Sequence, residues 1–238
     1  MEGKVVYGYQ VHAAIVSAGQ TALCYSLRRY SKEGKTKVEM TLDVLKSLPD
    51  QAGAYVLMDS WYTNPAILEE CEKKDCHLIG ATKTNRTLYP NGQRTSAMDY
   101  ACSLSPSHFH LVTVKGRTYW VHRYEGPLNK IHNAVVLLSY PKEAFGNPKA
   151  LRIFLCSDLS LDDRTILEYY SHRWKIEMMF RSQKRYMGFK SFMVRAAKAF
   201  DRLLTILCLA QFFFTCGLDS YLPFEASIRS CRASLCTF

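Results

Sequence analysis

The chain has 238 residues, 48% of them hydrophobic, which is enough for one substantial core with room for an inserted subdomain. Lys and Arg number 31 against 21 Asp and Glu, and the net charge of +10 favours a polyanionic partner. The nine cysteines are odd in number and form no C-x-x-C pair or zinc spacing, which excludes a disulfide scaffold and a zinc site. The cysteine pattern therefore predicts a protein of the reducing cytoplasm.

The N-terminal segments predict a β-hairpin followed by a helix. Lys4–Ser17 and Thr21–Ser31 are rich in Val, Tyr and Ile, with the turn Ala18-Gly19-Gln20 between them. No signal peptide is expected, because the first residues lead straight into a strand-like segment. Thr41–Leu48 predicts a short helix with Thr41 as its N-cap and Pro49 as its stop.

The next segments form a strand–helix–strand pattern. Ala54–Met58 is a short apolar run, Asn64-Pro65 gives an N-cap and first helical residue, and His77–Ala81 is a second apolar run. This is a βαβ signature. Asp59 then lies at the carboxyl end of a central strand, where α/β sheets place ligand-binding groups. A turn aspartate without a special role is the alternative.

Between Asn85 and Cys156 the pattern predicts β structure without a helix. Asn85–Ser107 is polar and rich in turn residues. Four strand-like segments follow: His108–Val114, Arg117–Tyr124, Asn133–Tyr140 and Leu151–Cys156. Turns are expected at Lys115-Gly116 and at Glu125-Gly126-Pro127, where the strand patterns break.

The C-terminal part is expected to be helical from Leu161, with Ser160 as its N-cap and a break near Gly188. Leu203–Leu218 is apolar but shorter than the roughly 20 residues of a membrane span, so a buried helix is preferred and a membrane partner is not expected. The tail Ser230–Phe238 has no structural pattern.

A polar stripe runs along this helical part. At ~100° per residue, Tyr170, Arg173, Glu177 and Lys184 share one narrow face, and Arg181 joins them. An apolar stripe lies next to it, made of Tyr169, Ile176, Phe180 and Met187. One carboxylate among three cations and a phenol suits a site that binds a metal and holds a phosphate backbone. The alternative is a solvated helix with ordinary Arg–Glu pairs.

Charge concentrates in the same region. Nine Lys or Arg lie between Tyr170 and Arg202, against Glu177 and Asp201. A local excess of this kind is the electrostatic footprint of nucleic acid, although a solvated helical face is also basic in many proteins.

Together these segments resemble the DDE transposases of bacterial insertion sequences, in the group defined by a Tyr-Arg-Glu-Lys signature. The resemblance rests on Asp59-Ser60-Trp61-Tyr62 after a short strand and on the spacing Tyr170-x2-Arg173-x3-Glu177-x6-Lys184. Supporting matches are Gly80-Ala81-Thr82-Lys83-Thr84-Asn85-Arg86 and Ala144-Phe145-Gly146-Asn147. The similarity extends from about Gly3 to Leu218.

The resemblance implies an α/β fold with an RNase H-like core and a β-rich insertion between the second and third acidic residues. It assigns residues 1–84 to the first part of the core, 85–157 to the insertion, 158–220 to the helical completion and 221–238 to a tail. It also implies DNA transposition by two-metal phosphoryl transfer with Mg²⁺, for which carboxylate oxygens are suitable ligands.

By the same resemblance, Asp59 and Glu177 match catalytic metal ligands. Tyr170, Arg173 and Lys184 match residues that hold transposon-end phosphates, and Arg181 lies on the same face. The implied partner is double-stranded DNA, with a homodimer as a second expectation, in the bacterial cytoplasm at the nucleoid.

One departure from the family concerns the first catalytic Asp, which is expected on a strand upstream of Lys4–His12. Glu2 is the only acidic residue before that segment. The expectation is therefore a truncated copy that is inactive in strand cleavage by itself. A DNA-binding remnant or regulator of transposition, a decaying reading frame, and an unrelated α+β protein are the alternatives.

Overall fold

The computed structural model describes residues 8–19, 21–50, 52–189 and 191–216. The chain divides into two compact units. One unit consists of Thr41–Arg173, and the other combines Met1–Met40 with Trp174–Phe238. The expected tail lies outside the described residues, and the division into core and insertion stays a prediction.

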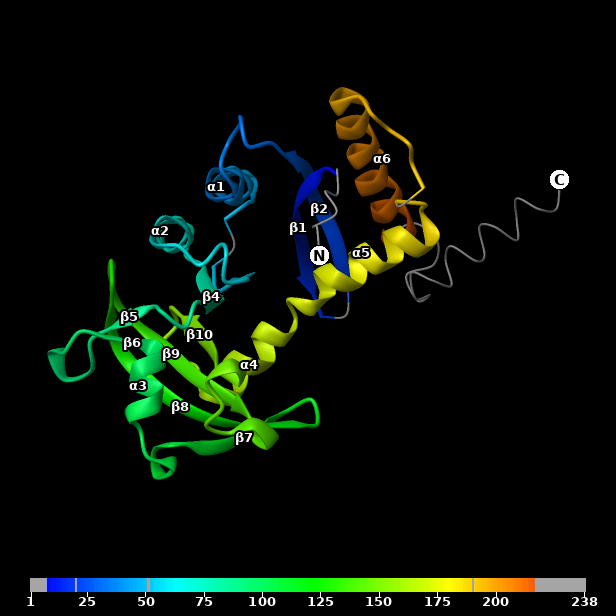
Figure 1. Ribbon diagram of the computed structural model, residues 1–238. Helices are drawn as coiled ribbons and strands as arrows, with labels where there is room; N and C mark the ends of the chain where they lie inside the picture. Colours follow the sequence, from blue (N-terminus) through cyan, green and yellow to red (C-terminus); the bar gives the residue numbers. More distant parts are fainter. Residues whose placement is uncertain (1–7, 20, 51, 190, 217–238) are drawn as a thin grey trace, which may run out of the picture. The chain divides into compact units, whose positions relative to one another are not determined.

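The unit Thr41–Arg173 is built on an eight-stranded sheet (Figure 1). Only the first two neighbours, β3 and β4, are parallel, and the other pairs are antiparallel. The strands lie in the order β3 (Tyr55–Met58), β4 (His77–Thr82), β10 (Arg152–Cys156), β9 (Ile131–Pro141), β8 (Arg117–Leu128), β5 (Thr87–Leu88) and β6 (Thr95–Ser96), with β7 (His110–Val114) paired to β8. The mixed α/β class is confirmed.

Helix α2 (Pro65–Lys73) connects the parallel strands and confirms the βαβ unit. Its N-cap is Asn64, whose side chain accepts a hydrogen bond from the backbone N–H of Ala66. Helix α4 (Asp163–Ser171) packs through Ile166 and Leu167 against the central strands, with Val135 and Leu137 of β9 in the same core cluster. Residues 134–140 of β9 are all buried, as a strand covered on both faces requires.

The second unit combines a hairpin with two helices. Strands β1 (Gln10–Ala18) and β2 (Thr21–Tyr30) pair antiparallel, which confirms the expected hairpin for the described residues. Helices α5 (Trp174–Tyr186) and α6 (Ala197–Cys216) share a core with it (Figure 1). The buried members of that core are Cys24, Leu27, Met179, Leu204 and Leu207.

Two expected helix starts are wrong because local capping acts elsewhere, and one helix forms where none was expected. Helix α1 spans Lys37–Ser47, and Thr36 and Glu39 hydrogen-bond each other's backbone N–H as a capping box, so Thr41 is not the N-cap. Asp162 rather than Ser160 caps α4. Helix α3 (Ala97–Ser103), capped by Ser96, forms in the region expected to lack helices.

The chain between β7 and β9 also departs in part from expectation. Lys115 and Gly116 form the expected turn, with φ of 49° and 76°. Strand β8 however continues through Glu125-Gly126-Pro127 to Leu128, because a bulge at this point accommodates Pro127 without ending the pairing with β9. Elsewhere in the described part of the chain, four short 3₁₀ turns lie in the connections: η1 (Pro90–Gly92), η2 (Pro106–His108), η3 (Lys142–Ala144) and η4 (Pro148–Ala150).

The expected continuous helix through the polar stripe is wrong. Helix α4 ends at Ser171 and α5 begins at Trp174. The backbone N–H groups of His172 and Arg173 bond to carbonyls three residues earlier, which tightens the last turn of α4 and ends it. Tyr170 and Arg173 therefore do not share a helical face with Glu177, Arg181 and Lys184.

Helix α6 is buried on one side only within its unit. Leu204, Leu207 and Gln211 are buried, whereas Ile206, Leu209, Phe212 and Phe213 are exposed. Among the described residues it is the one helix whose length and composition would let it cross a membrane, a property that core helices of soluble proteins share. The expectation of a buried helix is therefore wrong for most of α6, since only its inner side is buried within the described residues.

Candidate active site and nucleic-acid interface

Asp59 follows the last residue of β3, at the edge where the parallel strands β3 and β4 both end. Its Oδ1 accepts a hydrogen bond of 2.9 Å from the backbone N–H of Trp61, and its carbonyl accepts one from the N–H of Tyr62. These bonds fix the carboxylate in a tight turn, half exposed to solvent. The placement at a strand end agrees with the sequence-based expectation for this residue.

A close contact between the turn and β4 holds Asp59 in place. Thr63 Oγ1 donates to the carbonyl of Ala81 at 2.5 Å and contacts the carbonyl of Asp59 at 3.2 Å. A Cβ at position 80 would overlap Thr63 Oγ1, so only glycine lets the turn approach the strand this closely. Gly80 thus has a packing reason to occupy its position in the Gly80-Ala81-Thr82-Lys83 segment.

An aromatic side chain and a cation lie at the same edge. Trp61 is 70% exposed, and Lys83 Nζ lies 5.3 Å from the centroid of its ring, within cation–π distance. Burial and then the negative charge of Asp59 raise the pKa of Tyr62, so its hydroxyl stays protonated. The edge therefore combines a carboxylate, a phenol, an indole and an ammonium group.

Tyr170 and Arg173 lie at the C-terminal end of α4 and contact each other. The Arg173 guanidinium carbon lies 5.9 Å from the centroid of the Tyr170 ring. That ring also contacts Phe154 of β10, at a centroid distance of 4.7 Å. Tyr170 is therefore partly a packing residue of the sheet.

Glu177, Arg181 and Lys184 lie on α5 within about 60° of one another, at offsets of zero, four and seven residues. Glu177 is half-buried, whereas Arg181 and Lys184 are exposed. Ile176, Phe180 and Met187 pack against the core of their unit, which confirms three of the four residues of the expected apolar stripe. The fourth, Tyr169, belongs to the unit Thr41–Arg173 and contacts Tyr55 there, at a centroid distance of 4.9 Å.

The candidate residues are distributed over both units. Asp59, Tyr170 and Arg173 belong to Thr41–Arg173, while Glu177, Arg181 and Lys184 belong to the unit with α5 and α6. Within the described part of the chain, no group of three or more His, Cys, Asp or Glu side chains is arranged to hold a metal ion. Asp59 and Glu177 are carboxylates with solvent access, so their donor chemistry suits a hard divalent cation.

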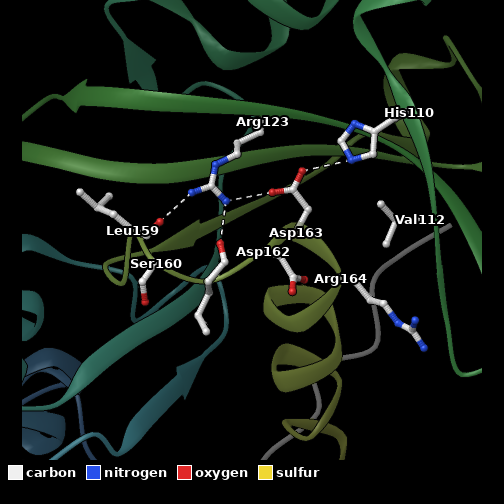
Figure 2. A pocket seen from close by; sticks show the side chains of 9 residues that line it. His110, Val112, Arg123, Leu159, Ser160, Asp162, Asp163 and Arg164 are labelled. Carbon is white, nitrogen blue, oxygen red and sulfur yellow. Dashed lines mark hydrogen bonds and ion pairs between the residues drawn. The ribbon is translucent and has the colours of Figure 1, made fainter.

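A hollow of about 500 Å³ lies between β7, β8 and the start of α4 (Figure 2). Arg123 crosses it, with Nη1 3.0 Å from Asp163 Oδ1 and 2.8 Å from the carbonyl of Leu161. Its Nη2 donates to the carbonyl of Leu159 at 2.9 Å. On the other side of the same carboxylate, His110 Nε2 lies 3.2 Å from Asp163 Oδ2.

This network ties the loop after β10 and the first residue of α4 to the sheet. Asp163 is 8% exposed, and the guanidinium of Arg123 compensates its buried charge, while His110 contacts its other carboxylate oxygen. Because Tyr170 lies on α4 and Arg173 follows the end of that helix by two residues, the network anchors the segment that carries both.

Sequence reasoning missed the Arg123–Asp163–His110 network and the contact between Thr63 and Gly80. The three ionisable residues are far apart in the sequence and follow no common period. The glycine in Gly80-Ala81-Thr82-Lys83, inside an apolar strand pattern, was a usable signal of close backbone approach.

Comparisons with known proteins now add to this geometry. A comparison with curated proteins found none that matches. The family model described as "Transposase DDE domain" matches residues 2–213, which is most of the chain and includes every candidate residue described above. The chain therefore belongs to the transposase DDE domain family.

Proposed function

We propose that this chain is the catalytic domain of a DNA transposase whose partner is double-stranded transposon ends, with an RNase H-like core and a β-rich insertion within residues 85–157, and that it is inactive in strand cleavage by itself. The observation that carries the proposal is the family match over residues 2–213, because that family indicates transposition and generally uses a divalent metal. The Tyr-Arg-Glu-Lys spacing from Tyr170 to Lys184 supports the narrower assignment to insertion sequences.

In this proposal Asp59 and Glu177 hold the metal, with Mg²⁺ as the preferred ion because both ligands are carboxylates. A bound ion would neutralise charge at the phosphate and lower the pKa of an attacking hydroxyl. The turn bonded to Asp59 keeps its carboxylate at the strand edge. Lys83 adds positive charge at that edge, where a DNA phosphate would approach.

The cations at the ends of α4 and on α5 are proposed to hold the DNA backbone. Arg181 and Lys184 are exposed one turn apart, and Arg173 lies beside Tyr170. Arg can bind a phosphate with two parallel hydrogen bonds, whereas Lys acts as a point charge. Binding of this type does not depend on base sequence and weakens as salt concentration rises.

DNA affinity measured against salt concentration tests this role. Removal of one cation that binds a phosphate should lower the slope of log K against log salt by about 0.9 for duplex DNA. We expect Arg181→Ala and Lys184→Ala each to weaken binding to a random duplex and to reduce that slope. Lys142→Ala, an exposed lysine in η3, is the matched control and should leave both unchanged. If all three variants bind like the parent chain, α5 is not the DNA-binding surface.

A plasmid-nicking assay with Mg²⁺ or Mn²⁺ separates catalysis from binding alone. Nicking by the parent chain would contradict the expectation of an inactive chain. If Asp59→Ala and Glu177→Ala each abolish that nicking while Glu143→Ala preserves it, the two metal ligands are established. Salt-dependent binding without nicking would instead favour a DNA-binding remnant or regulator. Absence of both activities would contradict both functions.

A further inference from the structure

Two cysteine sulfurs meet in the core of the unit formed by the hairpin, α5 and α6. Cys24 of β2 and Cys208 of α6 place their Sγ atoms 3.0 Å apart. Cys24 is 7% exposed and Cys208 is half-buried. A disulfide requires a separation of about 2.05 Å, so the two sulfurs need to approach by only about 1 Å.

A β-bulge in the hairpin brings Cys24 to this position. Ala14 pairs with Ser26 while Ile15 pairs with Cys24, so Tyr25 is an extra residue on β2. Residues three apart in a regular strand face opposite sides, but the bulge turns Cys24 and Leu27 to the same side. Both therefore belong to the core that Leu204 and Leu207 of α6 complete.

The surroundings of the two sulfurs differ and give them different roles. The hydrogen bond between the two sulfurs, in which either thiol can donate, and a second bond with the backbone of Leu27 lower the pKa of Cys208 despite its partial burial. The same hydrogen bond, together with burial, raises the pKa of Cys24. Cys208 is also the more exposed of the two sulfur-bearing side chains, so a small disulfide reaches it first, and it is the first nucleophile.

We propose that Cys24 and Cys208 are an oxidisable thiol pair, which closes to a disulfide between β2 and α6 on reaction with a low-molecular-weight disulfide. The proposal does not depend on the DNA-related function above. It assigns a covalent modification site to a surface of α6 that already packs on the hairpin.

The reaction is thiol–disulfide exchange in two steps. The Cys208 thiolate attacks one sulfur of the small disulfide RSSR, which forms a mixed disulfide on Cys208 and releases RS⁻. Cys24 then loses its proton to RS⁻ and attacks Cys208 Sγ, which releases the second RS⁻. The two protein thiols are oxidised by two electrons, and RSSR is reduced to two RSH.

The closed bond would join residues 184 positions apart in the sequence. It would hold α6 on the hairpin in addition to the ion pair between Arg29 Nε and Asp201 Oδ1, which are 3.0 Å apart. We therefore expect oxidation to raise the melting temperature of the protein and dithiothreitol to reverse the increase.

Peptide mapping of the full chain tests the proposal. The protein is treated with oxidised glutathione or with dithiothreitol, free thiols are blocked with N-ethylmaleimide, and the product is digested with chymotrypsin. Cleavage after Phe212 and Phe213 separates Cys208 from Cys216. The expected product is a peptide with Cys24 linked to one with Cys208, two hydrogens lighter than their sum and present only after oxidation.

Single substitutions assign the order of the steps. Cys24→Ala should trap glutathione on Cys208, whereas Cys208→Ala should leave Cys24 reduced. Cys102→Ala removes an exposed cysteine of the other unit and should leave the 24–208 linkage unchanged. The proposal is overturned if glutathione modifies Cys102 in the parent chain while Cys24 and Cys208 stay reduced. It is also overturned if Cys208 links to Cys102 or Cys216 instead.

Discussion

At the scale of single residues, Gly80 shows how one position fixes the candidate catalytic turn. Thr63 Oγ1 occupies the space that a Cβ at position 80 would need, and the same oxygen bonds to Ala81 of β4. The location of Asp59 therefore depends on a residue 21 positions further along the chain. The sequence placed Asp59 at a strand end, but it did not reveal this support.

We expect Gly80→Ala to lower the free energy of unfolding by about 1–3 kcal/mol, because the added methyl group overpacks a tight contact. Chemical denaturation measures the change. Thr63→Ala in the same chain should recover part of the loss, since it removes the overlapping hydroxyl. Gly34→Ala is the control, because Gly34 lies in an exposed turn with no atom closer than 3.7 Å to the added carbon. Equal effects of the substitutions at 80 and 34 would contradict the packing argument.

At the scale of elements, the break between α4 and α5 changes the interpretation of the polar stripe. Helical periodicity placed five polar residues on one face, but the two helices divide them into Tyr170 and Arg173 on one side and Glu177, Arg181 and Lys184 on the other. Periodicity could not detect the break, because the residues on both sides of it form helices. The joint action of the two groups on DNA stays a prediction.

The start of α4 offers a test that depends on pH. Asp162 accepts a hydrogen bond of 2.7 Å from the backbone N–H of Thr165, which lowers its pKa below the ordinary value. Since the folded-state pKa is the lower one, this cap stabilises the fold fully above the ordinary pKa of about 3.9 and is lost as the pH falls through the folded-state value.

We expect Asp162→Ala to cost about 1 kcal/mol of unfolding free energy at neutral pH. The cost should shrink as the pH is lowered below about 4 in urea denaturation. Asp162→Asn is the control, because its amide oxygen accepts the same bond without titrating in this range. A cost that stays constant over the whole pH range would show that the carboxylate charge contributes nothing to the cap.

At the scale of the whole molecule, each unit has its own hydrophobic core. Leu137 of β9 is fully buried in the core of Thr41–Arg173, and Leu204 of α6 is 1% exposed in the other core. Separate cores predict separate local unfolding, because disrupting the packing of one cluster leaves the other cluster intact.

Leu204→Ala should therefore accelerate amide hydrogen exchange in β1, β2, α5 and α6, with a loss of about 2–5 kcal/mol in local stability. Amides of β9 should keep their exchange rates in this variant. Leu137→Ala should give the reverse pattern. Uniform acceleration over both units in either variant would show that they unfold as one cooperative body.

The sequence by itself determined the features that depend on neighbouring residues: the hairpin, the strand–helix–strand unit with its Asn64 cap, and Asp59 after β3. It also contained the residues that resemble a DDE transposase, and the family match supports the transposase family, although not the Tyr-Arg-Glu-Lys subgroup. Tertiary structure decided the features that join distant segments: the turn packed on Gly80, the Arg123–Asp163 network and the Cys24–Cys208 pair. The physical reason is range, since propensity and capping act within a few residues, whereas these contacts arise only when separate strands and helices pack together.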